Sequence, residues 1–149
     1  RLTLKCYMAD TGLLISHAFD EKQIVSNELY RKLLLDKLEV NAGMLIENIV
    51  AQMLVAAGHN LYFYSNSDKE DAENRMEIDF LIRKDNVTSR HNIIPIEVKS
   101  SSGYTTHSLN KCAQKFKEYI TLPTVLHPAD YKEDTDGKRY LPLYMTSLL

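Results

Sequence analysis

Apolar residues recur with helical spacing most clearly between residues 41 and 57. The apolar positions of this stretch fall on one stripe, at Leu45, Ile46, Ile49, Val50, Met53, Leu54 and Ala57. Such a stripe is typical of an amphipathic helix, and Gly58 follows where helices commonly end in a left-handed residue. The pattern therefore predicts a helix over residues 41–57.

Shorter patterns predict further elements on both sides of this helix. Alternating or short apolar runs predict strands over 2–8, 61–64, 76–83, 92–99 and 124–127, and a final apolar run covers 140–149. Helical spacing predicts helices over 13–19, 27–38 and 108–120. Polar loops or turns are predicted at 65–75, 84–91, 100–103 and 136–137. Because the loop at 84–91 is too short for a helical crossover, we expect the strands beside it to pair antiparallel.

The composition fits a single folded domain over residues 1–149. Apolar residues make up 44% of the chain and charged residues 26%, which excludes a disordered or collagen-like chain. We expect a strand and helices over 1–39 and a core of helix, three strands, helix and strand over 40–149. No segment predicts a membrane span, because Glu47, Asn48 and Gln52 interrupt the most apolar stretch. Two distant cysteines outside any disulfide or zinc motif suit a cytoplasmic protein.

Charged residues on the two predicted central strands form a candidate metal site. Residues two apart on a strand face the same way, so Glu97 and Lys99 should project together, opposite the row of Ile94, Ile96 and Val98. Antiparallel pairing sets Asp79 beside Glu97. Neighbouring carboxylates repel one another and suit a hard cation such as Mg²⁺. On spacing alone, however, a Glu-x-Lys pair on a strand is more often a solvated ion pair.

A third acid and two lysines extend this candidate site. Glu47 lies about 20° beyond the apolar arc of the long helix, at 100° per residue, and can face the same spot. Seven basic and two acidic residues occur over 83–117, although the whole chain carries a formal charge of -2. Within that stretch Lys111 and Lys115 lie one helical turn apart, away from Phe116, where they can contact a nucleic-acid backbone or simply solvate the helix.

The order of these elements resembles the core of the PD-(D/E)xK nuclease superfamily. Glu47 lies on the predicted helix over 41–57, which is the first helix of that core. Asp79 lies on one strand, and Glu97 and Lys99 lie on the next, while Ile78 stands where the motif has proline. Five stretches, YMADTGLL (7–14), ENIVAQ (47–52), EIDFLI (77–82), IPIEVKS (94–100) and YLPLY (140–144), also resemble the C-terminal domain of a bacterial and archaeal family of AAA-type ATPases. This second resemblance spans nearly the whole chain.

The resemblance implies a fold, a chemistry and partners. The fold would be a restriction-endonuclease-like α/β fold, a central mixed β-sheet flanked by helices. Asp79, Glu97 and the Val98 carbonyl would hold Mg²⁺ or Mn²⁺, and Glu47 would contribute to the ion directly or through water. Lys99 would orient or deprotonate the attacking water.

The resemblance implies two partners, an ATPase module that precedes this domain and DNA or RNA as substrate. We expect a preceding module also because the chain begins at Arg1. ATP binding is not assigned to these residues, since no GxxxxGK[ST] motif is present. A non-catalytic regulatory or interaction domain of the ATPase with a vestigial nuclease fold is the alternative.

Overall fold

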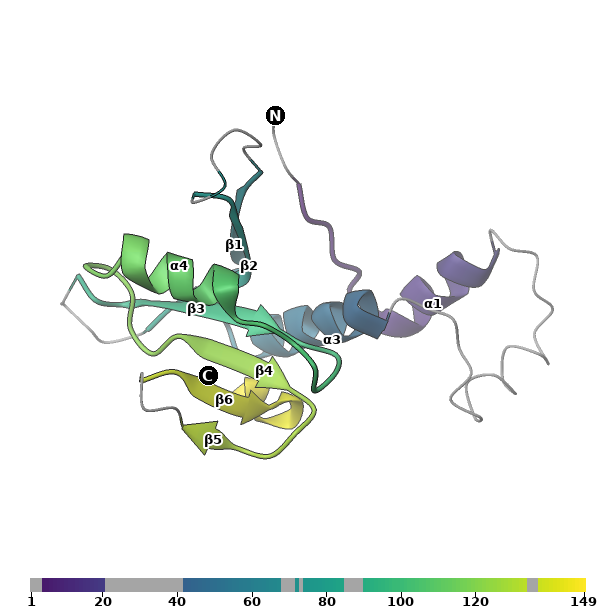
Figure 1. The fold of residues 1–149 in the computed structure, drawn as a ribbon. Helices are drawn as coiled ribbons and strands as arrows, with labels where there is room; N and C mark the ends of the chain where they lie inside the picture. The colour runs from purple at the N-terminus through teal and green to yellow at the C-terminus, as the bar shows by residue number, and fades with distance from the viewer. Residues whose placement is uncertain (1–3, 21–41, 68–71, 73, 85–89, 134–136) are drawn as a thin grey trace.

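A computed structural model describes residues 4–20, 42–67, 72, 74–84, 90–133 and 137–149. Its elements follow one another along the chain (Figure 1) as α1 (Thr11–Asp20), α3 (Ala42–Ala56), β1 (Tyr62–Asn66), β2 (Met76–Arg83), β3 (Ile93–Val98), α4 (His107–Lys115), β4 (Thr124–His127), β5 (Lys132–Glu133), β6 (Arg139–Pro142) and the 3₁₀-helix η1 (Leu143–Leu148). The helix predicted over 27–38 and most of the loop over 84–91 lie outside the described residues.

The strands form one mixed sheet in the order β1-β2-β3-β4-β6-β5. Strands β1, β2 and β3 pair antiparallel, as predicted for the last two, and Phe80 lies opposite Ile96. Strands β3, β4 and β6 then run parallel, and the short β5 closes the far edge antiparallel to β6. The predicted α/β class with a mixed sheet and flanking helices is therefore confirmed.

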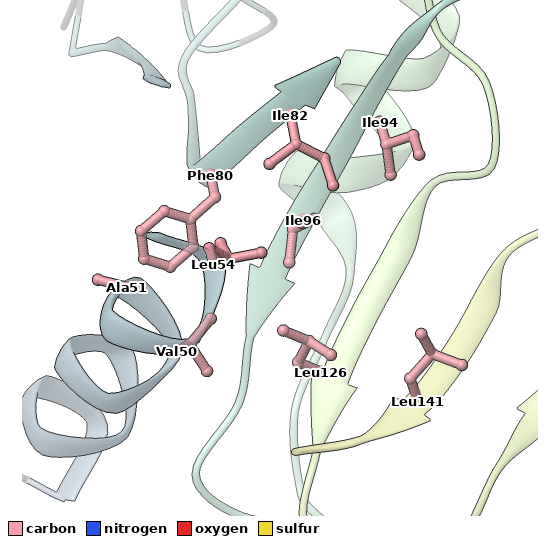
Figure 2. Packing of buried hydrophobic residues seen from close by; sticks show 9 residues of the cluster. All are labelled: Val50, Ala51, Leu54, Phe80, Ile82, Ile94, Ile96, Leu126 and Leu141. Atoms are coloured by element: carbon pink, nitrogen blue, oxygen red, sulfur yellow. The ribbon is translucent and has the colours of Figure 1, made fainter. Parts of the chain in front are cut away.

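Helices cover both faces of this sheet and create two apolar cores. Figure 2 shows the larger core, which joins α3 to the sheet through Val50, Ala51, Leu54, Phe80, Ile82, Ile94, Ile96, Leu126 and Leu141. The smaller core joins α4 to the other face through Met76, Ile78, Leu109, Cys112 and Val125. Because both faces are covered, side chains on β3 and β4 are buried or half-buried whichever way they point.

A β-bulge interrupts β2 in the middle of its pairing with β1. Tyr62 lies opposite Leu81 and Tyr64 opposite Ile78, so β2 carries one more residue than β1 between these pairs. An extra residue of this kind changes the direction in which the following side chains point. The bulge therefore falls at residues 79 and 80, within the candidate site.

The bulge overturns one prediction from the sequence. Strict alternation placed Ile78, Phe80 and Ile82 on the same face of the sheet. In the structure Ile78 packs in the core beside α4, whereas Phe80 and Ile82 pack in the core beside α3. The side chain of Asp79 consequently lies next to that of Phe80 on the side of α3.

The long helix α3 confirms the strongest sequence prediction and ends as expected. Gly58 has a φ of 93°, and its N–H donates to the Val55 carbonyl while the His59 N–H donates to the Leu54 carbonyl, each at 3.0 Å. These two bonds form a Schellman motif, which satisfies carbonyls at the end of the helix.

The strand predicted over 2–8 is wrong for its described part, residues 4–8, which pairs with no strand. Side-chain amides of α3 take the place of a neighbouring strand. The Met8 N–H donates to Asn48 Oδ1 at 2.8 Å, and the Met8 carbonyl accepts from Asn48 Nδ2 and Gln52 Nε2, each at 3.1 Å. The segment is therefore held beside α3 without a sheet.

Two further elements end differently from the prediction. Helix α4 stops at Lys115 instead of residue 120, because Ile120 forms a parallel bridge with Ile93 and the Tyr119 carbonyl accepts from the Ile93 N–H. The last apolar run is only partly a strand, since Leu143–Leu148 forms a 3₁₀-helix that packs on α3.

Candidate active site

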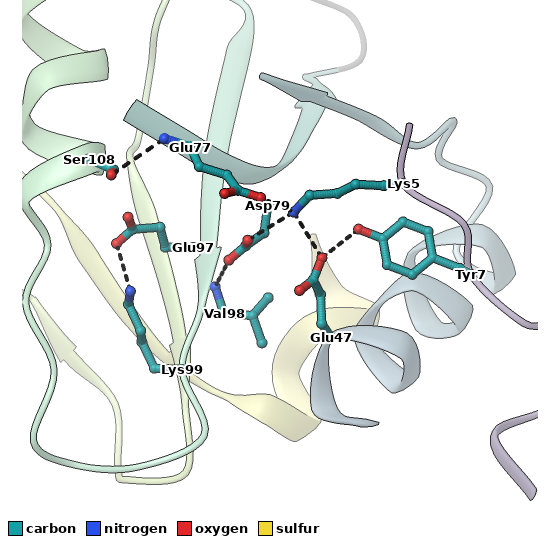
Figure 3. Close-up of polar contacts among 9 residues, drawn as sticks. All are labelled: Lys5, Tyr7, Glu47, Glu77, Asp79, Glu97, Val98, Lys99 and Ser108. Atoms are coloured by element: carbon teal, nitrogen blue, oxygen red, sulfur yellow. Dashed lines mark hydrogen bonds and ion pairs between the residues drawn. The ribbon is translucent and has the colours of Figure 1, made fainter. Parts of the chain in front are cut away.

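The centre of the candidate site is the ammonium group of Lys5, a residue that the sequence analysis did not single out (Figure 3). Its Nζ lies 3.0 Å from Glu47 Oε1, 3.0 Å from Glu77 Oε1 and 3.2 Å from Asp79 Oδ1. The segment 4–8, α3 and β2 each contribute to this group. Burial works against the charged form of Lys5, but the three carboxylates outweigh it and raise its pKa. An ammonium group therefore supplies the positive charge between Glu47, Glu77 and Asp79.

Tyr7 fixes the position of Glu47. Its hydroxyl donates to Glu47 Oε1 at 2.6 Å, and its ring lies 5.4 Å from the ring of Phe80. Burial raises the pKa of the Tyr7 hydroxyl, and the Glu47 carboxylate raises it further. Tyr7 therefore stays protonated and acts as a hydrogen-bond donor at neutral pH.

Asp79 connects the Lys5 group to β3. Its Oδ1 accepts from Lys5, and its Oδ2 accepts from the Val98 N–H at 2.8 Å. Burial raises the pKa of the Asp79 carboxyl and Glu47 adds to this effect, whereas the Val98 N–H and Lys5 oppose it. The bulge in β2 gives Asp79 access to both partners.

Glu97 and Lys99 form a second group on β3. Lys99 Nζ lies 3.5 Å from Glu97 Oε2, so the predicted pairing of these two side chains is confirmed. Glu97 is only 4% exposed, and its Oε2 has no hydrogen-bond partner among the described residues. Burial raises the pKa of Glu97 and the Asp79 charge adds to it, while Lys99 lowers it. Glu97 is thus a buried acid rather than one side of a solvated ion pair.

Asp79 and Glu97 lie on the neighbouring strands β2 and β3, but their side chains face opposite helical layers of the fold. Asp79 contacts Lys5 on the side of α3. Glu97 lies opposite Val125 in the parallel register, and Val125 packs in the core beside α4. Within the described ranges, no three His, Cys, Asp or Glu side chains are grouped so as to hold a metal ion.

Sequence reasoning missed Lys5 and Tyr7 because their partners are far away in the chain. Lys5 is 74 residues from Asp79, and Tyr7 is 40 residues from Glu47. The alternation of residues 4–8 offered a signal, but in the opposite sense from the one predicted. Leu4 and Cys6 are exposed, whereas Lys5 and Tyr7 turn inward.

The two lysines predicted to contact nucleic acid lie on α4 and hold the segment before β2. Lys111 Nζ donates to the Ala72 carbonyl at 2.8 Å, and Lys115 Nζ donates to Asn74 Oδ1. Together with neighbouring residues they line an open hollow of about 610 Å³. These contacts leave nucleic-acid binding as a prediction.

Across the part of the chain that the structure describes, no helix combines the length and apolar character needed to cross a bilayer.

Comparison with known proteins places the chain in a family. No curated protein and no solved structure matches the chain. A family model does match residues 42–146, which span α3 to η1 and include Glu47, Asp79, Glu97 and Lys99. The chain therefore belongs to the family described as "Domain of unknown function (DUF4143)", which in general is found in the C-terminal regions of AAA-type ATPases.

Proposed function

We propose that this domain is a Mg²⁺-dependent nuclease of the PD-(D/E)xK type, with a restriction-endonuclease-like fold, within an AAA-type ATPase. The observation that carries the proposal is the order α3-β1-β2-β3-α4-β4 together with the position of each motif residue. Glu47 lies on α3, Asp79 on β2, and Glu97 with Lys99 on β3, which is the arrangement that the resemblance to that superfamily implies. The substrate would be a phosphodiester of DNA or RNA.

The donor groups are oxygen atoms, the type of ligand that a single Mg²⁺ ion takes. Mg²⁺ prefers oxygen ligands and is commonly held by one or two carboxylates, with waters and substrate phosphates completing its shell. Glu97 Oε2 is a buried oxygen that has no hydrogen bond in the described chain and only the ion pair with Lys99 Nζ at 3.5 Å, and the Asp79 charge is close enough to raise the pKa of Glu97. Asp79, Glu97 and the Val98 carbonyl would hold the ion, and Glu47 would act through Lys5 and Asp79.

The protein residues around such an ion have separable roles. When bound, the ion polarises the scissile phosphate and lowers the pKa of an attacking water. The Val98 N–H holds Asp79 in one orientation. Lys99 lies beside Glu97 and is 24% exposed, so its ammonium can donate to the attacking water and offset charge that develops on the phosphate.

A second candidate function is a non-catalytic interaction domain of the ATPase. The observation that favours it is the Lys5 ammonium, which already neutralises part of the charge on Glu47, Glu77 and Asp79. In this case the acids would serve the structure of the domain, and no ion would bind.

Thermal unfolding with Mn²⁺ separates the two candidates. If an ion binds the folded chain, Mn²⁺ raises the melting temperature. At a hundredfold excess of Mn²⁺ over Kd, the free energy of unfolding rises by about 2.7 kcal/mol. Asp79→Ala should abolish this rise, whereas Glu118→Ala, at an exposed acid on the segment after α4, should leave it intact. A parent protein whose melting is insensitive to Mn²⁺ would favour the interaction domain.

Cleavage of DNA and RNA substrates tests catalysis directly. Parent protein with Mg²⁺ should cut one of the two, and Lys99→Ala should lose most of the rate. Lys117→Ala, which removes an exposed lysine outside the site, is the matched control. Equal rates for the parent and Lys99→Ala would remove Lys99 from the mechanism.

A further inference from the structure

We propose that the Lys5 ammonium is a built-in second cation of this site, which holds Glu47, Glu77 and Asp79 together in place of a second divalent ion. The nuclease therefore works with one divalent ion rather than two, and this conclusion about the number of ions rests on the proposed function. Removing the charge of Lys5 should create a new divalent-cation site.

The surroundings of Lys5 are those of a cation site. Three carboxylate oxygens from α3 and β2 lie within 3.2 Å of Nζ, and Nζ also lies 5.9 Å from the centre of the Phe63 ring. The face of an aromatic ring attracts cations. Lys5 itself is only 14% exposed. The carboxylates and the ring, which come from separate segments, thus converge on a single positive charge.

The position of Lys5 is fixed by its neighbours rather than by its own flexible chain. Tyr7 is bonded to Glu47, and Met8 is bonded through both backbone groups to Asn48 on α3. These anchors lie two and three residues from Lys5. The ammonium is therefore held in place when the chain folds, as a resident ion would be.

The charge of the whole site agrees with a single divalent ion. The four carboxylates of Glu47, Glu77, Asp79 and Glu97 and the two ammonium groups of Lys5 and Lys99 carry a formal charge of -2, which one Mg²⁺ neutralises. A second Mg²⁺ would leave an excess of positive charge at the point where Lys5 already stands. An ammonium group also differs from a metal because it neutralises acids without activating a bound water.

Counting bound Mn²⁺ ions by electron paramagnetic resonance and calorimetry tests the inference on the full chain. The parent should bind one Mn²⁺ at this site, and Lys5→Met should bind one more, at least tenfold tighter than any additional Mn²⁺ taken up by the parent. Lys5→Arg keeps the charge and should bind the same number of ions as the parent. Adding Glu47→Gln to Lys5→Met should remove the gained ion.

The outcomes distinguish this inference from the proposed function. Two ions in the parent, or one ion in both the parent and folded Lys5→Met, would overturn the role of Lys5 and leave the nuclease proposal standing. No ion in either protein would overturn both. No ion in the parent and one in Lys5→Met would support the role of Lys5 as a resident cation and overturn the nuclease proposal. If Lys5→Met does not fold, Lys5→Gln carries the same expectations, because its amide still donates hydrogen bonds to the acids.

Discussion

Asn48 is the residue on which the N-terminal segment depends most. Its side chain is 3% exposed; Oδ1 accepts from the Met8 N–H, and Nδ2 donates to the Met8 carbonyl and to Thr11 Oγ1. In Asn48→Ala, Gln52 Nε2 still serves both the Met8 carbonyl and Thr11 Oγ1. Only the Met8 N–H then loses its sole protein partner among the described residues.

The structure sets the size of the expected loss for Asn48→Ala. A hydrogen bond contributes about 0.5–1.5 kcal/mol, and a buried group left without a partner costs about 1–3 kcal/mol. Met8 is half-buried, so water replaces part of the loss. We expect Asn48→Ala to lower the free energy of unfolding by about 2 kcal/mol.

Urea unfolding measures this loss, and Gln52→Ala provides the comparison. Gln52→Ala leaves all three Asn48 bonds in place and should cost about 0.5–1 kcal/mol. Hydrogen exchange at the Met8 amide should accelerate in Asn48→Ala and stay slow in Gln52→Ala. Equal losses of stability in the two variants, or an unchanged Met8 exchange rate in Asn48→Ala, would refute this account of how the segment is held.

Three further predictions concern the site, the end of α3 and the core. Burial raises the pKa of Glu97 and Asp79 adds to it, so the folded state keeps this proton more tightly and stability falls as pH rises from about 4 through the raised pKa. The stability of Glu97→Gln relative to the parent should therefore grow between pH 4 and pH 8 in urea titrations, and a constant difference would contradict the reasoning. Gly58→Ala forces a side chain into a φ of 93° and should cost about 1–2 kcal/mol, whereas an unchanged urea midpoint would argue against the left-handed helix end. Ile96→Ala empties a fully buried position and should cost about 2–5 kcal/mol; a loss below that range would mean that the core collapses around the gap.

Local patterns predicted the elements that carry the motif residues. The apolar stripe of α3, the Gly58 stop and the antiparallel pair β2–β3 all depend on neighbours close in the sequence. For this reason the sequence alone predicts Glu47 on a helix, and Asp79 and Glu97 on adjacent strands.

The directions of the side chains depended on partners that the sequence does not place. The bulge in β2 arises from its register with β1, so strict alternation gave the wrong face for Ile78 and did not reveal that Asp79 turns toward Lys5. The segment 4–8 alternates like a strand, yet it exposes 78% of Leu4 and turns Lys5 inward toward the acids. Electrostatic attraction to α3 and β2 decides which side of this segment is buried.

The family match begins at residue 42, whereas Lys5 and Tyr7 precede it. A fragment cut at that border would retain Glu47, Glu77 and Asp79 but lose the ammonium group and the phenol that contact them. Mutual repulsion of the three acids would then loosen the junction of α3 with β2, or recruit a divalent ion from the buffer. Biochemical work on such fragments would therefore describe a different electrostatic state from that of a chain that keeps residues 4–8.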